Sequence, residues 1–106
     1  MQFLVLAGGR ESTRDVLIEE GCEVLRAAGD VAVISQPGTP PAQLPAGFVE
    51  GMPQADAVVI SPWLRPPSRP EDWQRAARMK VLAGTFDFRF DGWLDFEAMA
   101  SRGIAI

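Results

Sequence analysis

The residue types in this chain limit the chemistry it can perform. None of its 106 residues is histidine, the commonest general acid–base residue and metal ligand in proteins. The single cysteine, Cys22, therefore has no histidine to activate it as a nucleophile, and a half-buried thiol on a helix is the favoured interpretation. Catalysis would have to rest on carboxylates, on Lys80 or on arginines.

Arg10 is a candidate anion contact, because it follows the Gly8-Gly9 pair directly after an apolar run. Backbone N–H groups at the start of a helix attract negative charge, and a guanidinium would add to that attraction. The turn has neither the GxGxxG pattern nor the P-loop pattern, however, and Glu11 would repel a phosphate. A tight strand-to-helix turn is therefore favoured, with an anion contact by Arg10 as the alternative.

Arg89 is a second candidate anion contact, and it lies in a loop rich in aromatic residues. The aromatic side chains could wall a pocket in which Arg89 faces an acid, but aromatic residues more often serve packing. An aromatic mini-core, with Arg89 paired to Asp87 or Asp91, is favoured. The acids of this loop lack EF-hand spacing, so we expect no metal site. The aromatic residues are Phe86, Phe88, Phe90 and Trp93.

Five short apolar runs, separated by helical segments, predict the elements that position these loops. Continuous apolar runs are typical of strands buried on both faces of a parallel sheet. The alternation predicts an α/β fold with right-handed crossovers, and we expect a flavodoxin-like three-layer sandwich with strand order 2-1-3-4-5. Ligands of such sheets bind at the carboxyl ends of the strands. The predicted strands are 3–7, 31–34, 57–61, 80–83 and 104–106.

A long helix is expected between the first two strands. Ser12 is its candidate N-cap and Gly29 its candidate stop. Gly21, inside the helix, would allow a close approach to the sheet. A shorter helix that ends at Gly21, followed by a strand at 22–25, is the alternative.

Three shorter helical segments are expected farther along the chain, the last one capped by Asp95 and stopped by Gly103. The helix that usually follows a fifth strand is missing, which predicts that apolar surface of the sheet is exposed. Such a surface usually finds a partner, so we expect a homodimer through that face, or a domain swap through the proline-rich loops. The three segments are 48–52, 70–78 and 96–102.

Three segments carry a resemblance to a known family: the run 55–63, the run 79–84 and the ending Arg102-Gly103-Ile104. Their order resembles the first half of the substrate-binding domain of D-2-hydroxyacid dehydrogenases, including the formate dehydrogenase branch. In that family a Pro-aromatic pair lines the substrate pocket, and the backbone of a glycine-rich turn contacts the substrate. The residues of this chain that match these positions are Pro62, Trp63, Gly84 and Thr85. Packing of Trp63 over the edge of the sheet is the alternative, and it is favoured for this chain alone.

The resemblance implies reversible reduction of a 2-oxo acid by NAD or NADP, in a cleft between this domain and a nucleotide-binding domain. The catalytic residues and the dinucleotide fingerprint of the family lie downstream of the matched segments. We therefore assign no catalytic residue and no cofactor to this chain, and we expect a truncated or excised half of the substrate-binding domain that is inactive alone. A free-standing flavodoxin-like module that binds a small ligand or a protein partner is the alternative.

Length and composition indicate a single domain over residues 1–106. The net charge of −4, the pI near 4.7 and the lack of a dense basic run argue against nucleic acid or an anionic membrane as partner. No apolar run has the length of a membrane span or of a signal-peptide core. We therefore expect a cytoplasmic protein.

Overall fold

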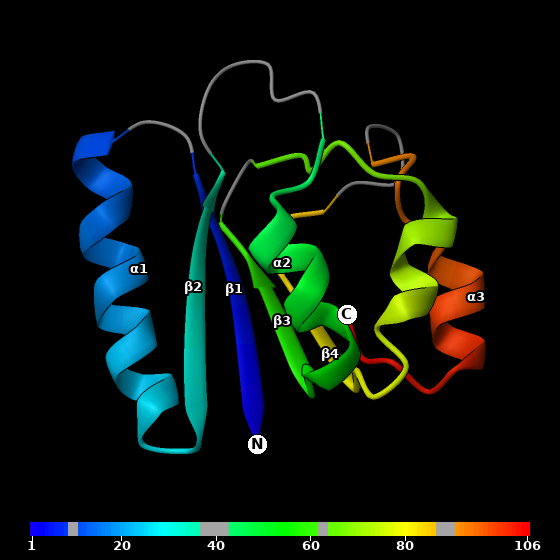
Figure 1. Ribbon diagram of the computed structural model, residues 1–106, viewed down its shortest axis with the longest axis horizontal. Helices are drawn as coiled ribbons and strands as arrows, with labels where there is room; N and C mark the ends of the chain where they lie inside the picture. The colour runs from blue at the N-terminus through cyan, green and yellow to red at the C-terminus, as the bar shows by residue number, and fades with distance from the viewer. Residues whose placement is uncertain (9–10, 37–42, 62–63, 87–90) are drawn as a thin grey trace.

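Parallel strands form the sheet at the centre of the molecule (Figure 1). The computed structural model describes residues 1–8, 11–36, 43–61, 64–86 and 91–106. Within these ranges the strands lie in the order β2-β1-β3-β4, which confirms the predicted α/β class and the predicted order of the first four strands. The strands are β1 (Gln2–Gly8), β2 (Asp30–Gln36), β3 (Ala57–Ile60) and β4 (Val81–Ala83).

The register of the sheet brings the ends of the strands together. Phe3 of β1 pairs with Val31 of β2 on one side and with Ala57 of β3 on the other. Val59 of β3 pairs with Ala83 of β4. Because every pairing is parallel, the carboxyl ends lie along one edge, at the top of Figure 1. We call this edge the carboxyl edge.

The predicted fifth strand is wrong, because the described residues form four strands. The segment 104–106 makes a single parallel bridge, between Ala105 and Val81. Ala105 accepts a hydrogen bond from the N–H of Leu82 (2.8 Å) and donates one to the carbonyl of Lys80 (2.9 Å). The N–H of Ile104 instead donates to Met99 (3.0 Å) at the end of the last helix, so Ile104 is not available to extend a ladder.

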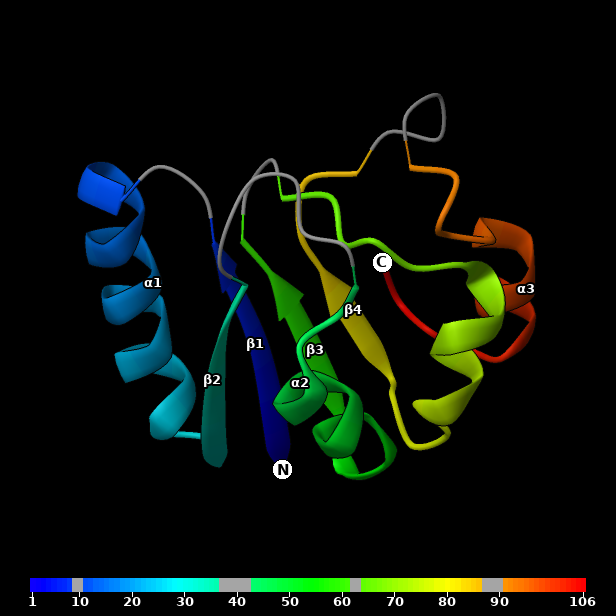
Figure 2. The ribbon, with the colours of Figure 1, turned by 45° about the horizontal axis from the view of Figure 1, so that its top comes forward.

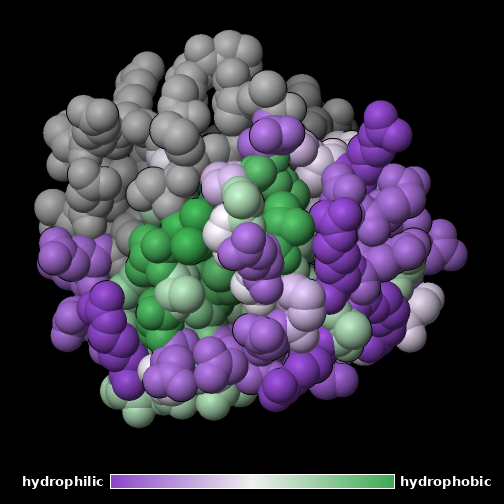
Figure 3. Space-filling view, in the orientation of Figure 1, coloured by the Kyte–Doolittle hydropathy of each residue, from purple (hydrophilic) through white to green (hydrophobic). Residues whose placement is uncertain are grey.

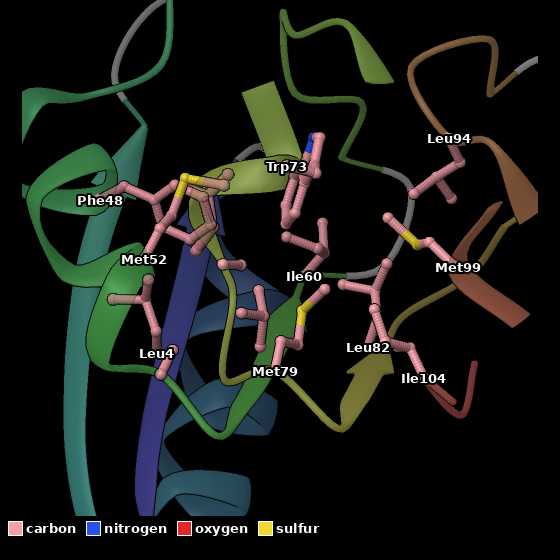
Figure 4. Packing of buried hydrophobic residues seen from close by; sticks show 14 of the residues in the cluster. Leu4, Phe48, Met52, Ile60, Trp73, Met79, Leu82, Leu94, Met99 and Ile104 are labelled. Atoms are coloured by element: carbon pink, nitrogen blue, oxygen red, sulfur yellow. The ribbon is translucent and has the colours of Figure 1, made fainter. Parts of the chain in front are cut away.

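Helices cover the two faces of the sheet unequally (Figures 1 and 2). The strand order shows that the chain moves one way across the sheet from β1 to β2 and the other way from β2 to β3 and β4. Right-handed crossovers therefore place the helix that links β1 to β2 on one face of the sheet and the later helical segments on the other face. Figure 4 shows α2 in front of β1 and α1 behind it. The segments are α1 (Glu11–Arg26), α2 (Ala46–Gly51), η1 (Met52–Gln54), η2 (Pro70–Arg75) and α3 (Phe96–Ser101).

The main core lies between one face of the sheet and the helical segments α2, η2 and α3 (Figure 4). An aromatic chain crosses it: Phe48 meets Trp73 edge to face, with ring centroids 5.9 Å apart, and Trp73 packs against Trp93 at 5.1 Å. Alternate strand residues supply the floor of the core, as the period of a strand requires. These strand residues are Leu4, Leu6, Val58, Ile60 and Leu82.

The long helix α1 runs without a break past Gly21, which confirms the longer helix over the alternative with a strand at 22–25. It begins at Glu11, so Ser12 lies inside the helix and the prediction that Ser12 is the N-cap is wrong. The close approach at Gly21 is also wrong, because nothing lies within 4 Å of the position that a Cβ would take there. Gly29 is the glycine that close packing requires, since a Cβ there would collide with the carbonyl of Met1.

The segment predicted as a helix at 70–78 is a shorter 3-10 helix, η2. Its N–H groups reach back three residues, from Asp72 to Arg69 (3.0 Å) and from Ala76 to Trp73 (3.1 Å). At Ala76 the backbone leaves the helical region, with φ −81° and ψ 60°, and the helix ends. The segment predicted as helical at 48–52 is helical, with α2 ending at Gly51 and η1 continuing the helical backbone to Gln54.

Helix α3 forms as expected. The carboxylate of Asp95 accepts a hydrogen bond from the N–H of Ala98 (2.9 Å), which confirms Asp95 as the N-cap. Gly103 has a φ of +76°, a value that favours glycine, and ends the helical turn.

The face of the sheet that carries α1 is only partly covered. Phe3 and Val5 are buried there, but Val33 is 40% exposed and Val81 41% exposed. Figure 3 shows further apolar surface over β2 and α2. The prediction of exposed apolar sheet surface is therefore confirmed for these two valines.

Candidate functional site

Three strand ends meet at the carboxyl edge. Ser61 directly follows β3 and is buried, and its N–H donates to the carbonyl of Leu6 in β1 (2.9 Å). The hydroxyl of Ser61 donates to the carbonyl of Gly8, at the end of β1 (3.4 Å). These bonds hold the end of β3 against the end of β1.

Gly84 brings the end of β4 to the same place. A Cβ at Gly84 would lie 2.5 Å from Cζ of Phe86 and 3.3 Å from the carbonyl oxygen of Ile60. A side chain at position 84 would therefore have to displace the Phe86 ring and press against the end of β3. Gly84 and Thr85 are both exposed, so two of the predicted substrate-binding residues lie at the carboxyl edge and are open to solvent.

The other predicted site residues are not placed. Both candidate anion contacts, Arg10 and Arg89, and the predicted pocket pair, Pro62 and Trp63, lie outside the described residues. The same holds for Asp87, and for the aromatic residues Phe88 and Phe90.

Phe86 and Trp93, the two described aromatic residues of the loop after β4, pack together. Their ring centroids lie 5.5 Å apart with an interplanar angle of 76°, and Trp93 is buried. Trp93 continues into Trp73 and so into the main core. For these two residues the packing interpretation holds, and the contact holds Phe86, two residues after Gly84, against the main core.

The structure adds two residues that the sequence did not single out as a pair, Arg65 and Asp91. The Nε of Arg65 lies 3.7 Å from Oδ1 of Asp91, and the same oxygen accepts a hydrogen bond from Nε1 of Trp93 (2.9 Å). Asp91 is 1% exposed and Arg65 is 38% exposed. The sequence offered only a general signal, an aspartate within an apolar aromatic loop, because the partner Arg65 comes from another loop.

Asp56 marks the opposite edge of the sheet. Its Oδ2 accepts a hydrogen bond from the N–H of Gln2 (2.7 Å), and its Oδ1 meets Nη2 of Arg78 (3.3 Å). The Gln2 N–H lowers the pKa of this carboxyl below its ordinary value, and the charge of Arg78 lowers the pKa further. Asp56 precedes β3 rather than following it, so its role is in joining strands and not at the carboxyl edge.

Other features of the described residues do not form a competing site. A hollow of about 210 Å³ lies between η2 and α3, and no predicted site residue lines it. Within the described ranges, no group of three or more His, Cys, Asp or Glu side chains could hold a metal ion. Cys22 is 3% exposed, more deeply buried than the half-buried position that we expected. In the described part of the chain no helix is both long enough and apolar enough to cross a membrane.

Gly84 and Thr85 lie exposed at the carboxyl ends of parallel strands, the edge at which ligands of such sheets bind. The sequence has no histidine to transfer a proton there.

Comparison with known proteins identifies the fold. No protein-family model matches the chain, and no curated protein matches it. Among solved structures, the chain is similar to a NAD+-bound 3-phosphoglycerate dehydrogenase from Entamoeba histolytica, with a TM-score of 0.67 and 18% sequence identity. The match covers 98% of this chain but 31% of that enzyme. The resemblance to D-2-hydroxyacid dehydrogenases is thus confirmed as a likeness of fold to one part of such an enzyme.

Proposed function

We propose that this chain is the substrate-binding part of an NAD(P)-dependent D-2-hydroxyacid dehydrogenase. One observation carries the proposal: nearly the whole chain, 98% of it, matches a part of a NAD+-bound dehydrogenase. The resemblance in the sequence places the substrate-contacting turn at Gly84 and Thr85, and both residues lie at the edge of the sheet where ligands of such folds bind.

In this proposal the chain binds and orients a 2-oxo acid. Backbone N–H groups at Gly84 and Thr85 meet the carboxylate of the substrate, because hydrogen bonds to a charged acceptor are the stronger ones. The Phe86 ring lies beside Gly84 and keeps water from that side of the turn. Pro62 and Trp63 line the neighbouring part of the pocket, as the family resemblance implies.

The residues of this chain do not fit a nicotinamide cofactor. The 106 residues contain no GxGxxG fingerprint, whose glycines and helix start hold the pyrophosphate of a dinucleotide. We therefore assign NAD or NADP, and the transfer of the hydride, to a nucleotide-binding domain of the parent enzyme. The 106 residues by themselves are inactive in this proposal, since they also lack a histidine for proton transfer.

Calorimetry on the purified 106-residue chain tests this function. Oxalate, a stable analogue of a 2-oxo acid, is expected to bind, whereas NADH is expected not to bind. A mixture of chain, pyruvate and NADH is expected to show no loss of the NADH absorbance. Turnover of pyruvate, or tight binding of FMN without any binding of oxalate, would contradict the proposal.

We propose further that two copies associate through the partly covered face of the sheet that carries α1. Val33 and Val81 lie on that face, and both side chains are exposed because no helix in the described part of the chain covers these strand positions. Burial of apolar strand residues against a second copy would remove this surface from water.

A further inference from the structure

The proposed function leaves one buried charged group without a role. Asp91 is 1% exposed, and its Oδ1 accepts a hydrogen bond from Nε1 of Trp93 (2.9 Å) and lies 3.7 Å from Nε of Arg65. Burial of a carboxylate costs free energy unless partners compensate, and such pairs are poor devices for stability alone. Their best-attested use is to fix one specific arrangement of the chain.

The arrangement fixed here joins two loops of the carboxyl edge. Arg65 belongs to the loop that follows β3 and Ser61, whereas Asp91 and Trp93 belong to the loop that follows β4 and Gly84. The hydrogen bonds of the sheet hold only the first residues of each loop. Arg65 and Asp91 lie farther along their loops, past the ends of β3 and β4. The contact between Arg65 and Asp91 therefore ties the two loops together beyond the sheet.

Aromatic packing connects the Arg65–Asp91 contact to the proposed ligand-binding turn at Gly84 and Thr85. Trp93, which Asp91 holds by its indole N–H, packs against the ring of Phe86 at 5.5 Å. Phe86 in turn lies against Gly84, where it leaves no room for a Cβ. Physical contact is thus continuous from Arg65 through Asp91, Trp93 and Phe86 to Gly84.

We propose that Asp91 is a positioning residue, which clamps the loop after β3 to the loop after β4 and so forms the carboxyl edge before a ligand arrives. The benefit for the binding of a 2-oxo acid rests on the proposed function, while the clamp itself does not. Pre-formed sites bind more tightly because the ordering of the loops has already been achieved in the free protein.

Amide hydrogen exchange followed by NMR tests the clamp without a ligand. The amides of Leu64 and Ser68 report on the first loop, since they donate to Ser61 (3.1 Å) and Pro66 (2.8 Å). The amide of Leu94, which donates to Asp91 (3.0 Å), reports on the second loop. Asp91→Asn keeps the size of the side chain and an acceptor for Trp93 but removes the charge that attracts Arg65. We expect it to speed exchange at these amides about tenfold.

Arg65→Gln breaks the same pair from the other side, and it serves if Asp91→Asn does not fold. Amide exchange in the double variant is expected to be no faster than in the faster of the two single variants, because the effects of two residues of one pair are not additive. Arg65→Lys keeps the positive charge and is expected to restore part of the protection. Asp56→Asn is the matched control, since it breaks an ion pair at the opposite edge and should speed exchange only near Gln2, whose N–H donates to the Asp56 carboxylate (2.7 Å).

Oxalate titrations of the same variants separate this inference from the proposed function. Weaker binding by Asp91→Asn and Arg65→Gln, each by roughly fivefold or more, supports the clamp as a positioning device. Unchanged exchange in both loops, or additive effects in the double variant, would overturn it. If the unaltered chain does not bind oxalate, the proposed function fails, and the exchange data still decide whether Asp91 clamps the loops.

Discussion

Gly84 is the residue at which backbone geometry and proposed function meet most closely. A Cβ there would lie 2.5 Å from the Phe86 ring and 3.3 Å from the Ile60 carbonyl, so Gly84→Ala must displace the ring. We expect a loss of about 1–3 kcal/mol in the free energy of unfolding, as for other overpacked sites. Oxalate binding should weaken as well, because the displaced ring alters the turn. Urea unfolding and calorimetry measure the two effects.

Gly92→Ala is the matched control for that substitution. Gly92 belongs to the same loop, is exposed, and has nothing within 4 Å of the position of a Cβ. Its stability should stay within about 0.5 kcal/mol of the original protein. Equal losses in the free energy of unfolding from the two substitutions would show that the close contacts around Gly84 are not the reason why the turn needs glycine.

Asp56 gives the chain a defined response to acid. Its folded-state pKa is depressed by the Gln2 N–H and by Arg78, so the carboxylate stabilises the folded state above its unfolded pKa of about 3.9. This contribution is lost as the pH falls through the lower, folded-state pKa. Urea unfolding from pH 7 downward should show a shallower loss of stability below pH ~4 for Asp56→Asn than for the original protein. Identical pH profiles would contradict the assignment.

At the scale of elements, Arg102 shows how the last helix supports η2. Its Nη2 donates to the carbonyl of Ala76 (2.7 Å) and its Nη1 to that of Trp73 (3.4 Å), so it satisfies carbonyl groups at the end of η2. Arg102→Met keeps much of the side-chain bulk and removes these bonds. We expect a loss of about 1–3 kcal/mol in the free energy of unfolding.

Arg26→Met is the control for Arg102→Met. Arg26 meets Glu23 at 2.7 Å, but both side chains are largely exposed, so this pair should contribute at most about 1 kcal/mol. Thermal and urea unfolding of the two variants should therefore differ clearly. If Arg26→Met were the more damaging change, the capping role of Arg102 would be refuted.

The sequence predicted the elements wherever a local pattern decides them. Apolar runs predicted β1 to β4, and Asp95 with Gly103 predicted the limits of α3. The 3-10 form of η2 and the loss of the fifth strand depend on hydrogen bonds that have no local pattern. For example, the N–H of Ile104 donates to the carbonyl of Met99 and does not donate to a neighbouring strand.

The candidate site was predictable only in part, for the same reason. Gly84 and Thr85 follow from their place after an apolar run and from the family resemblance. The pairing of Arg65 with Asp91 joins two loops that only the folded sheet brings together, so spacing in the sequence does not reveal it. The burial of Asp91 likewise depends on Trp93 and the core behind it.

At the scale of the whole molecule, the uneven cover of the sheet predicts association. Light scattering should give twice the 11.5 kDa mass of one chain. Val81→Lys places a charge on the exposed strand position and should yield monomers, because burial of an unpaired charge is costly. Ala100→Lys adds the same charge on the exposed side of α3, on the other face, and should remain a dimer. A monomeric original protein at high concentration would contradict the proposed interface.

In the proposed function, the molecule forms one side of a substrate cleft. The carboxyl edge is the surface that such a cleft would use, because Gly8 ends β1 there and Ser61 and Gly84 directly follow β3 and β4. The position at which a ligand binds is therefore as informative as the binding itself.

An NMR titration of the isotope-labelled chain with oxalate locates that binding directly. We expect the largest amide shifts at Gly8, Ser61, Gly84 and Thr85, and we expect the amides beside Asp56 at the opposite edge to keep their shifts. Saturable shifts centred on the hollow between η2 and α3, or the absence of shifts at the carboxyl edge, would contradict this expectation.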